Sequence, residues 1–410
     1  MREPALPLDS WLLKPSHHAW LTAEGLRLLP FAAASRVEGG FAALDARGAL
    51  PAGAVAELIH TARMTHCFAL AHIQGVPGYA HLVDHGLAAL QGPLRDAQHG
   101  GWFADARREG GKSAYLHAFV ALAASSAQLA GRPAAQALLG EAIRVLEQHF
   151  WSEEEGALRE YFNGDWREEE AYRGANSNMH GVEAFLALAD ATGEVHWLQR
   201  ALRIVERLIH RHAAAQGHVV VEHFDRQWHA RPEYNADNRA DPFRPFGSTP
   251  GHSFEWARLL LHLQAALRRA GVEAPEWLLD DALDLFASAC RDAWAVDGAE
   301  GLVYSLDWQG EPVVRARLHW VHAEAIAAAA ALLRRTGDDG YETWYRRFWE
   351  FTARHFIDLE HGSWHHELDT DNRPAASIWP GKPDLYHAYQ ALLLPRLPLA
   401  PGLAKALSTV

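Results

Sequence analysis

The feature that most constrains the fold of this chain is a hydrophobic period of three to four residues, which recurs along almost its whole length. This period gathers apolar side chains on one face of an α-helix. Gly and Pro stand at many of the breaks between periodic segments, where helices end and turns begin. The pattern predicts about twelve helices, over residues 8–35, 51–74, 76–91, 112–130, 133–150, 177–192, 194–214, 251–270, 275–293, 319–336, 340–358 and 383–395.

Consecutive helices joined by short turns pair into hairpins, so the pattern predicts six helical hairpins. Four longer loops place Gly beside aromatic and acidic residues and alternate apolar with polar positions, which is typical of short β-hairpins. These loops are residues 100–103, 156–162, 301–308 and 362–369. Repeated hairpins with such loops on one face indicate a closed helical toroid, and an open solenoid is the structural alternative. Because no linker rich in Pro, Gly and Ser interrupts the pattern, we expect one domain over residues 1–410.

Charge and cysteine content exclude several classes of partner. Of 410 residues, 38 are Lys or Arg and 51 are Asp or Glu, which gives a net charge of −13. So acidic a chain does not suit nucleic acid or an anionic membrane, both of which attract basic patches. No apolar run is long enough to span a bilayer, and the first residues do not resemble a signal peptide. The two cysteines, Cys67 and Cys290, suggest no disulfide framework, so we expect a cytoplasmic protein.

The chain holds 16 Trp and 26 His. Aromatic rings are common in sugar sites, because the C–H faces of a sugar stack on them while its hydroxyls find polar partners. Filling of a large helical core would also use Trp. A metal site is not indicated, because there is no His-Glu-x-x-His or Cys-x-x-Cys motif and the histidines cluster only at 17–18 and 365–366.

One candidate for acid–base chemistry lies at a predicted helix start. Pro250 and Gly251 open the helix, and His252 and Glu255 follow at positions i and i+3, on one face of its first turn. A carboxylate beside an imidazole can fix its tautomer and tune it near neutral pH. A capping His with an ordinary helix Glu fits the same spacing. Glu and His at this spacing also ligate paired metals in helical bundles, but only one convincing copy is present.

Two further helix starts carry histidine. Asn176 and Asn178 precede a helix, and His180 follows in its first turn, which suggests a substrate-facing edge as well as a cap. Asp384 suits the positive end of another helix, and His387 lies one turn in. Packing of His387 against its helix neighbours fits the spacing equally well.

Polar side chains in otherwise apolar helical runs indicate a polar interior. Arg63 lies in such a run, and burying it requires partners or a cavity. Tyr115, Trp320 and Glu324 likewise lie on early turns. All these motifs fall on alternate helices, which form the inner ring of a toroid, so we expect them to converge on one pocket. The long irregular segment 217–250 is rich in aromatics and Arg, and we expect it to form a lid or wall there.

In combination these motifs resemble the N-acylglucosamine 2-epimerase superfamily. The resemblance rests on Thr-Ala-Arg-Met-Thr-His at 61–66, Asn-Ser-Asn-Met-His at 176–180, Pro-Gly-His through Glu-Trp at 250–256 and Asp-Leu-Tyr-His at 384–387. It extends over nearly the whole chain, including Val-Asp-His-Gly at 83–86 and Tyr-Glu-Thr-Trp-Tyr at 341–345. Within the superfamily the chain looks most like the aldose–ketose isomerases that act on mannose and sulfoquinovose.

The resemblance implies an all-α (α/α)6 barrel and interconversion of an aldose and a ketose without metal, nucleotide or other cofactor. It implies that His387 is the base that moves a proton between C2 and C1. His252 would be the second acid/base, which also helps to open the sugar ring, with Glu255 at its side. The remaining matches imply substrate-binding positions, at Arg63, Tyr115, Asn176, His180, Arg244, Trp320, Glu324 and His366.

Alternatives remain open on the sequence. The sulfoquinovose enzymes carry Gln where this chain has His366 and Pro383, which favours a neutral hexose such as mannose, or the pentose lyxose, although a protonated His366 would still bind an anion. Return of the proton to C2 instead of C1 would make the enzyme a 2-epimerase. A glycoside hydrolase would need two opposed carboxylates, for which Glu255 and Glu324 are the candidates. A non-catalytic carbohydrate-binding protein is a further alternative, and a homo-oligomer is compatible with the sequence.

Overall fold

The computed structural model describes residues 4–409, and helices dominate it. The α-helices are α1 (Pro15–Ala33), α2 (Leu58–Ile73), α3 (Ala80–Gln91), α4 (Ala114–Leu129), α5 (Ala135–Val145), α6 (Ala175–Thr192), α7 (His196–Val205), α8 (Pro250–Arg269), α9 (Trp277–Ala293), α10 (His319–Thr336), α11 (Asp339–His355), α12 (Tyr386–Leu393) and α13 (Leu403–Leu407). In the described part of the chain, no helix is long and apolar enough to cross a membrane.

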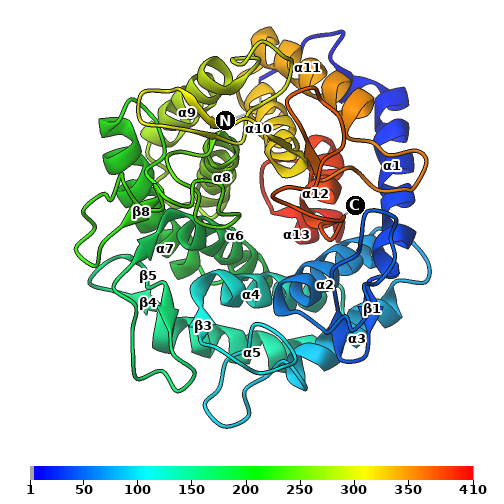
Figure 1. Ribbon diagram of the computed structural model, residues 1–410, viewed down its shortest axis with the longest axis vertical. Coiled ribbons are helices and arrows are strands. Elements are labelled where there is room, and N and C mark those ends of the chain that lie inside the picture. The colour runs from blue at the N-terminus through cyan, green and yellow to red at the C-terminus, as the bar shows by residue number, and fades with distance from the viewer. Residues whose placement is uncertain (1–3, 410) are drawn as a thin grey trace.

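The helices form two concentric rings, as Figure 1 shows. In the inner ring α2, α4, α6, α8, α10 and α12 each pack against the next, and α12 packs back against α2. The outer ring consists of α3, α5, α7, α9, α11 and α1, each packed on an inner helix. This is an (α/α)6 barrel, as predicted. The open-solenoid alternative is wrong, because the contact between α12 and α2 closes the ring.

The two rings differ in how their helices are buried. In α10 the run of buried residues is continuous from His319 to Leu333, and α2 and α8 are also buried on nearly every side. A helix buried all round belongs to a core. The Ala-rich stretch 327–331 lets neighbouring inner helices approach closely. The outer helices are amphipathic, with one apolar stripe toward the inner ring.

Twelve two- or three-residue strands lie among the described residues and pair into six small antiparallel ribbons. They are β1 (Arg36–Val37) with β2 (Gly40–Phe41), β3 (Lys112–Ser113) with β6 (Tyr161–Phe162), β4 (Trp151–Ser152) with β5 (Ala157–Leu158), β7 (Arg173–Gly174) with β8 (His223–Phe224), β9 (Ser305–Leu306) with β10 (Pro312–Val314), and β11 (Arg317–Leu318) with β12 (Glu367–Leu368). The predicted hairpin at 301–308 is therefore confirmed. At 100–103 the local antiparallel pairing is reduced to one isolated bridge between Arg95 and Trp102.

In the loop at 362–369 the strand β12 makes a local antiparallel bridge between Leu368 and Pro374, and it also pairs with the distant β11, which was not predicted. The ribbons β3–β6, β7–β8 and β11–β12 share one arrangement. In each, the strand that leads into an inner helix pairs with the next long loop along the chain. These ribbons tie the loops together around the mouth of the barrel.

Two helix boundaries depart from the periodic pattern. The segment expected from residue 51 becomes helical only at Leu58, because Pro51 and Gly53 form a turn. The first helix begins at Pro15, where the ring occupies the first-turn position that tolerates the missing N–H. The short helix α13 was not predicted.

Candidate active site

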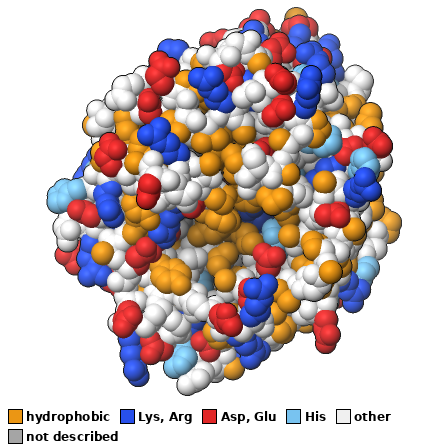
Figure 2. Space-filling model, viewed as in Figure 1, with side chains coloured by type: hydrophobic (Ala, Val, Ile, Leu, Met, Phe, Trp, Pro, Cys, Tyr) orange, Lys and Arg blue, Asp and Glu red, His pale blue; other side chains and the backbone are white. Residues whose placement is uncertain are grey.

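A cavity opens at the centre of the barrel, at the N-terminal ends of the inner helices. Figure 2 shows the hollow on this face, with hydrophobic side chains around it and histidine inside. Its lining residues are Arg63, Tyr115, Asn176, His180, Pro242, Phe243, His252, Glu255, His319, Trp320, Trp379, Asp384 and His387. Helix N-termini carry partial positive charge, so this end of the barrel favours an anionic intermediate.

His387 forms a dyad with Asp384 at the start of α12. The ring Nδ1 of His387 makes a short hydrogen bond with the Asp384 carboxylate, which also faces the backbone N–H of His387. Burial raises the pKa of Asp384, but His387, Arg63 and His319 together hold it well below its usual range. Asp384 is therefore a carboxylate and accepts the Nδ1 proton, which leaves Nε2 of His387 as a lone-pair base.

His252 is oriented in the same way, but by a carboxylate that the sequence did not reveal. Its Nδ1 lies 2.9 Å from Oε1 of Glu222, in the segment that leads into β8. The sequence placed Glu255 beside His252, but the hydrogen bond to His252 comes from Glu222 and not from Glu255. Glu255 lines the same cavity, but its carboxylate lies 3.7 Å from Nδ1 of His180 and 3.5 Å from Arg258.

Arg63 is buried among aromatic rings on one wall of the cavity. Its guanidinium lies over Phe119 and Tyr386, at 4.4 and 4.8 Å from the ring centroids. It donates to the Tyr115 hydroxyl at 3.0 Å and lies 3.7 Å from Asp384. The cost of burying this cation is offset by the π faces and the carboxylate. The polar interior expected from Arg63 is confirmed.

A layer of buried charge forms the floor of the cavity. Arg258 donates to Glu324 at 2.9 Å and lies beside Glu255. Burial, followed by the charge of Glu324, raises the pKa of Glu255 well above its usual range. Glu183 behaves in the opposite way: burial raises its pKa, but His180, Arg258 and the Tyr386 hydroxyl outweigh that and lower it. Burial and Glu324 thus favour the protonated form of Glu255, whereas the groups around Glu183 favour its anion.

Trp320 lies close to both imidazoles. Its ring centroid lies 5.2 Å from that of His252 and 5.7 Å from that of His387. Gly251 makes this placement possible, because a Cβ there would lie 2.4 Å from the Trp320 ring. A flat apolar face beside two imidazoles suits the C–H face of a sugar.

Three predicted site residues do not line the cavity. Arg244 pairs with Glu170 at 3.0 Å and lies over Tyr172, 4.1 Å from the ring centroid. Glu324 lies in the floor, bound to Arg258. His366 is stacked behind His319, with ring centroids 3.9 Å apart.

Sequence reasoning missed several residues of the site. Segment 217–250 does supply a wall, as predicted, but through Pro242 and Phe243. His319 stands next to Trp320 in the His-Trp-Val-His motif, so a signal for it was present. No local signal marks Glu222, because it lies thirty residues before His252.

Three buried groups have the composition of a metal site in residues 4–409. They are His319, Asp384 and His387; His180, Glu183 and Glu255; and Glu255, Glu324 and His387, each with ligand atoms within 4.8 Å of one another. Arg63 lies against the first group and Arg258 against the other two. These guanidiniums and the hydrogen bonds already satisfy the carboxylates, so the donor sets do not fit a cation.

The barrel and the histidines at the mouths of its inner helices define a family. The model of the N-acylglucosamine 2-epimerase family matches residues 39–391, and the chain belongs to this family. It is similar to a D-mannose isomerase of Pseudomonas cannabina pv. alisalensis, at 65% identity over 98% of this chain and 97% of that protein. A D-mannose isomerase of Thermobifida fusca is 55% identical, over 98% and 99% of the two chains. A crystal structure of a D-mannose isomerase superposes with a TM-score of 0.85 at 29% identity, over 95% and 99% of the chains.

Proposed function

We propose that this protein is an aldose–ketose isomerase that interconverts D-mannose and D-fructose. The observation that carries the proposal is the pair of oriented imidazoles, His252 and His387, which line one cavity and both lie close to Trp320. Each has its Nδ1 held by a buried carboxylate, which leaves Nε2 free to act on the substrate. The similarity to proteins named D-mannose isomerase supports the choice of sugar.

In this proposal His387 removes the proton at C2 of the open-chain aldose and returns it to C1. The proton at C2 is weakly acidic, so the base must be positioned and the cis-enediolate oxygens need electrostatic stabilisation. The Arg63 guanidinium and the helix N-termini provide positive charge for that purpose. His252 exchanges protons with the sugar oxygens and assists ring opening, and the neutral acid of Glu255 can donate a hydrogen bond nearby.

A neutral sugar fits this site better than sulfoquinovose. Burial, with the neighbouring His319, lowers the pKa of His366 well below its ordinary value, so this ring does not become a cation for a sulfonate. The hydrolase alternative is not supported either. Glu324 does not line the cavity but is bound to Arg258, so Glu255 and Glu324 do not flank a space in which a glycosidic bond could lie.

Incubation with D-mannose in D₂O, followed by NMR, tests the proposal. Fructose as the main product supports it. Glucose as the main product would instead make the protein a 2-epimerase. If neither forms, the same assay with D-lyxose and sulfoquinovose identifies the aldose, and turnover of sulfoquinovose but not mannose contradicts the proposed substrate.

A further inference from the structure

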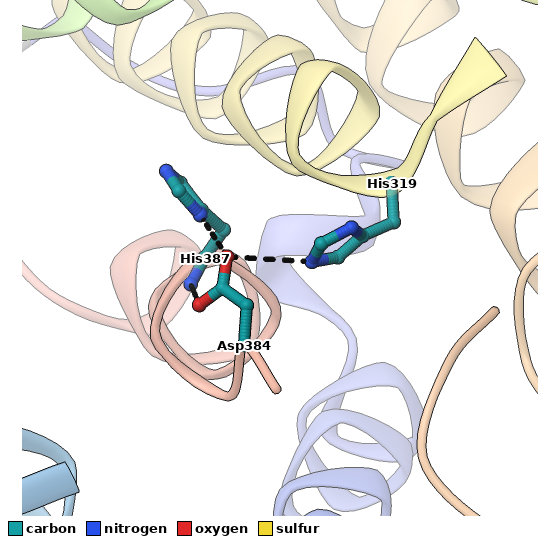
Figure 3. Close-up of side chains that lie close together, drawn as sticks. All are labelled: His319, Asp384 and His387. Atoms are coloured by element: carbon teal, nitrogen blue, oxygen red, sulfur yellow. Dashed lines mark hydrogen bonds and ion pairs between the residues drawn. The ribbon is translucent and has the colours of Figure 1, made fainter. Parts of the chain in front are cut away.

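His319 lies directly behind the catalytic dyad and has no part in the proton transfers proposed above. It is the first residue of α10, and it is buried with its Nε2 3.5 Å from Oδ2 of Asp384. Figure 3 shows Asp384 between the rings of His319 and His387. Nε2 of His319 has no other partner in the described part of the chain. The carboxylate that orients His387 thus faces a second imidazole.

The β11–β12 ribbon fixes the position of this ring. Leu318 pairs with Glu367, so His319 follows directly opposite His366. The His366 carbonyl accepts the backbone N–H of His319 at 3.1 Å, and the two rings stack with their planes 8° apart. The stacked ring of His366 holds the plane of His319 toward Asp384.

Both ring nitrogens of His319 face acceptors. Nδ1 lies 3.4 Å from the His366 carbonyl oxygen, and Nε2 faces Asp384. Burial lowers the pKa of His319, despite the nearby Asp384, so the neutral ring has one proton for two acceptors. The carboxylate is the stronger acceptor, and the carbonyl already has a donor. The proton therefore belongs on Nε2. Contacts of this length in a free enzyme commonly tighten when substrate binds.

We propose that His319 is a positioning residue that donates its Nε2–H to Asp384 and so sets the pH at which His387 becomes a usable base. This rests on the proposed role of His387. A hydrogen bond donated to Asp384 withdraws part of the negative charge that would otherwise stabilise protonated His387. Without that donor, His387 holds its proton to higher pH, and the acid limb of kcat/KM moves upward.

Other charged and titratable groups also face the dyad, and they stay unchanged in the experiment below. They are Arg63 and His60 from α2, Tyr115 from α4, His180 from α6, Glu255 from α8, Glu324 from α10 and Tyr386 from α12. Because all of them act on each variant equally, a shift between variants reports the His319 contact.

Two replacements separate the two ring nitrogens. In His319→Gln the amide N–H₂ reaches the position of Nε2, whereas in His319→Asn it reaches only that of Nδ1. We expect His319→Gln to keep the wild-type pH profile of kcat/KM. We expect His319→Asn and His319→Leu to move the acid limb upward by about half to one pH unit, with kcat at high pH within about threefold of wild type.

His322 provides a matched control one turn further along α10. It is equally buried, with Nδ1 facing the Leu318 carbonyl and Nε2 accepting from the Leu302 N–H, and it does not line the cavity. His322→Gln should lower the melting temperature without moving the acid limb. If His319→Asn and His319→Leu keep the wild-type limb, or His319→Gln shifts it equally, the proposal is wrong.

A second measurement does not depend on the sugar or on turnover. NMR of the histidine rings as a function of pH, with His387 assigned from its loss in His387→Gln, follows protonation of His387 in each folded variant. An upward shift of its midpoint in His319→Leu supports the proposal even if mannose is not the substrate. An unchanged midpoint overturns it, whatever the protein isomerises.

Discussion

The two imidazoles of the cavity are oriented by carboxylates of different origin. Asp384 lies three residues before His387 and reaches it within the first turn of α12, whereas Glu222 reaches His252 from another segment. In both cases the carboxylate accepts the Nδ1 proton of the histidine. It thereby fixes the tautomer of the ring, and its negative charge also stabilises the protonated ring. Replacing the carboxylate with an amide of the same shape removes the charge but keeps the packing, so it tests whether the charge is required.

Asp384→Asn makes this replacement beside His387. Oδ2 of Asp384 faces both Nδ1 of His387 and the Arg63 guanidinium, so the amide oxygen of Asn takes that position and still accepts the Nδ1 proton, but the negative charge is lost. Protonated His387 then loses the carboxylate that stabilises it, so the ring is a weaker base. We expect kcat to fall about 100-fold or more, with little change in KM.

Steady-state kinetics with D-mannose measure this effect. Asp190→Asn is the matched control, because Asp190 accepts from the Gly402 N–H away from the cavity. It should leave kcat unchanged. A kcat for Asp384→Asn within threefold of wild type would show that the carboxylate charge is not required.

Glu255 and Glu183 should respond oppositely to amide replacement. Since burial and Glu324 raise the pKa of Glu255, Gln reproduces its protonated shape, and Glu255→Gln should retain kcat within about tenfold. Glu183 is an anion that accepts from Tyr386 and Gln390. Glu183→Gln weakens the hydrogen bonds from Tyr386 and Gln390 and removes the negative charge near Arg258, and should cost about 1.5–3 kcal/mol of stability. Kinetics and urea unfolding measure the two effects. An inactive but stable Glu255→Gln would show that Glu255 works as an ionised base.

At the scale of elements, buried ion pairs fix the segments that lead into four of the inner helices. Lys112, Arg173, Arg317 and Lys382 each lie shortly before an inner helix. They pair with Asp96, Glu155, Asp297 and Asp358, each of which follows the preceding outer helix. The same ion pair therefore recurs in four helical hairpins, and it fixes the loops next to the site residues.

Arg317→Met tests the importance of the buried ion pair before α10. Arg317 and Asp297 are both buried and meet at 2.6 Å, so the change leaves Asp297 uncompensated. We expect a loss of about 3–5 kcal/mol in the free energy of unfolding, measured by urea denaturation. Arg317→Met combined with Asp297→Leu should recover part of it. Arg354 and Glu300 form a similar pair at 3.1 Å on the surface, and Arg354→Met should cost less than about 1 kcal/mol. Equal losses in both variants would exclude a special role for the buried pair.

Elements with a local signal could be predicted from the sequence, and elements that depend on distant partners could not. The inner helices carry their period in their own residues, and the (α/α)6 arrangement followed from it together with the family resemblance. The pairing of β11 with β12 joins segments about fifty residues apart, so no local pattern indicates it. Likewise, the family resemblance places Arg244 among the substrate-binding residues. Only the fold shows that Arg244 instead forms an ion pair with Glu170, outside the cavity lining.

At the scale of the molecule, the barrel buries many histidines as neutral rings. Burial lowers the pKa of His60, His66, His180 and His262 to about 4, and that of His117 and His322 to about 3. Their ordinary value, near 6.5, applies in the unfolded chain. Between these values the unfolded chain binds more protons than the folded one, so stability falls as the pH falls from about 6.5 to 4.

We therefore expect the melting temperature to drop steeply over that window, beginning well above the pH at which carboxylates titrate. Each buried histidine adds a slope of up to about 1.4 kcal/mol per pH unit. His262→Asn keeps a donor for the Leu399 carbonyl but cannot titrate, so it should reduce the slope by about that amount. His229 is exposed on a loop, and His229→Asn should not change the slope. Thermal unfolding followed by circular dichroism at a series of pH values measures this. A melting temperature that stays flat down to pH 4 would mean that the barrel interior admits the protons, and that its histidines are not held neutral by burial.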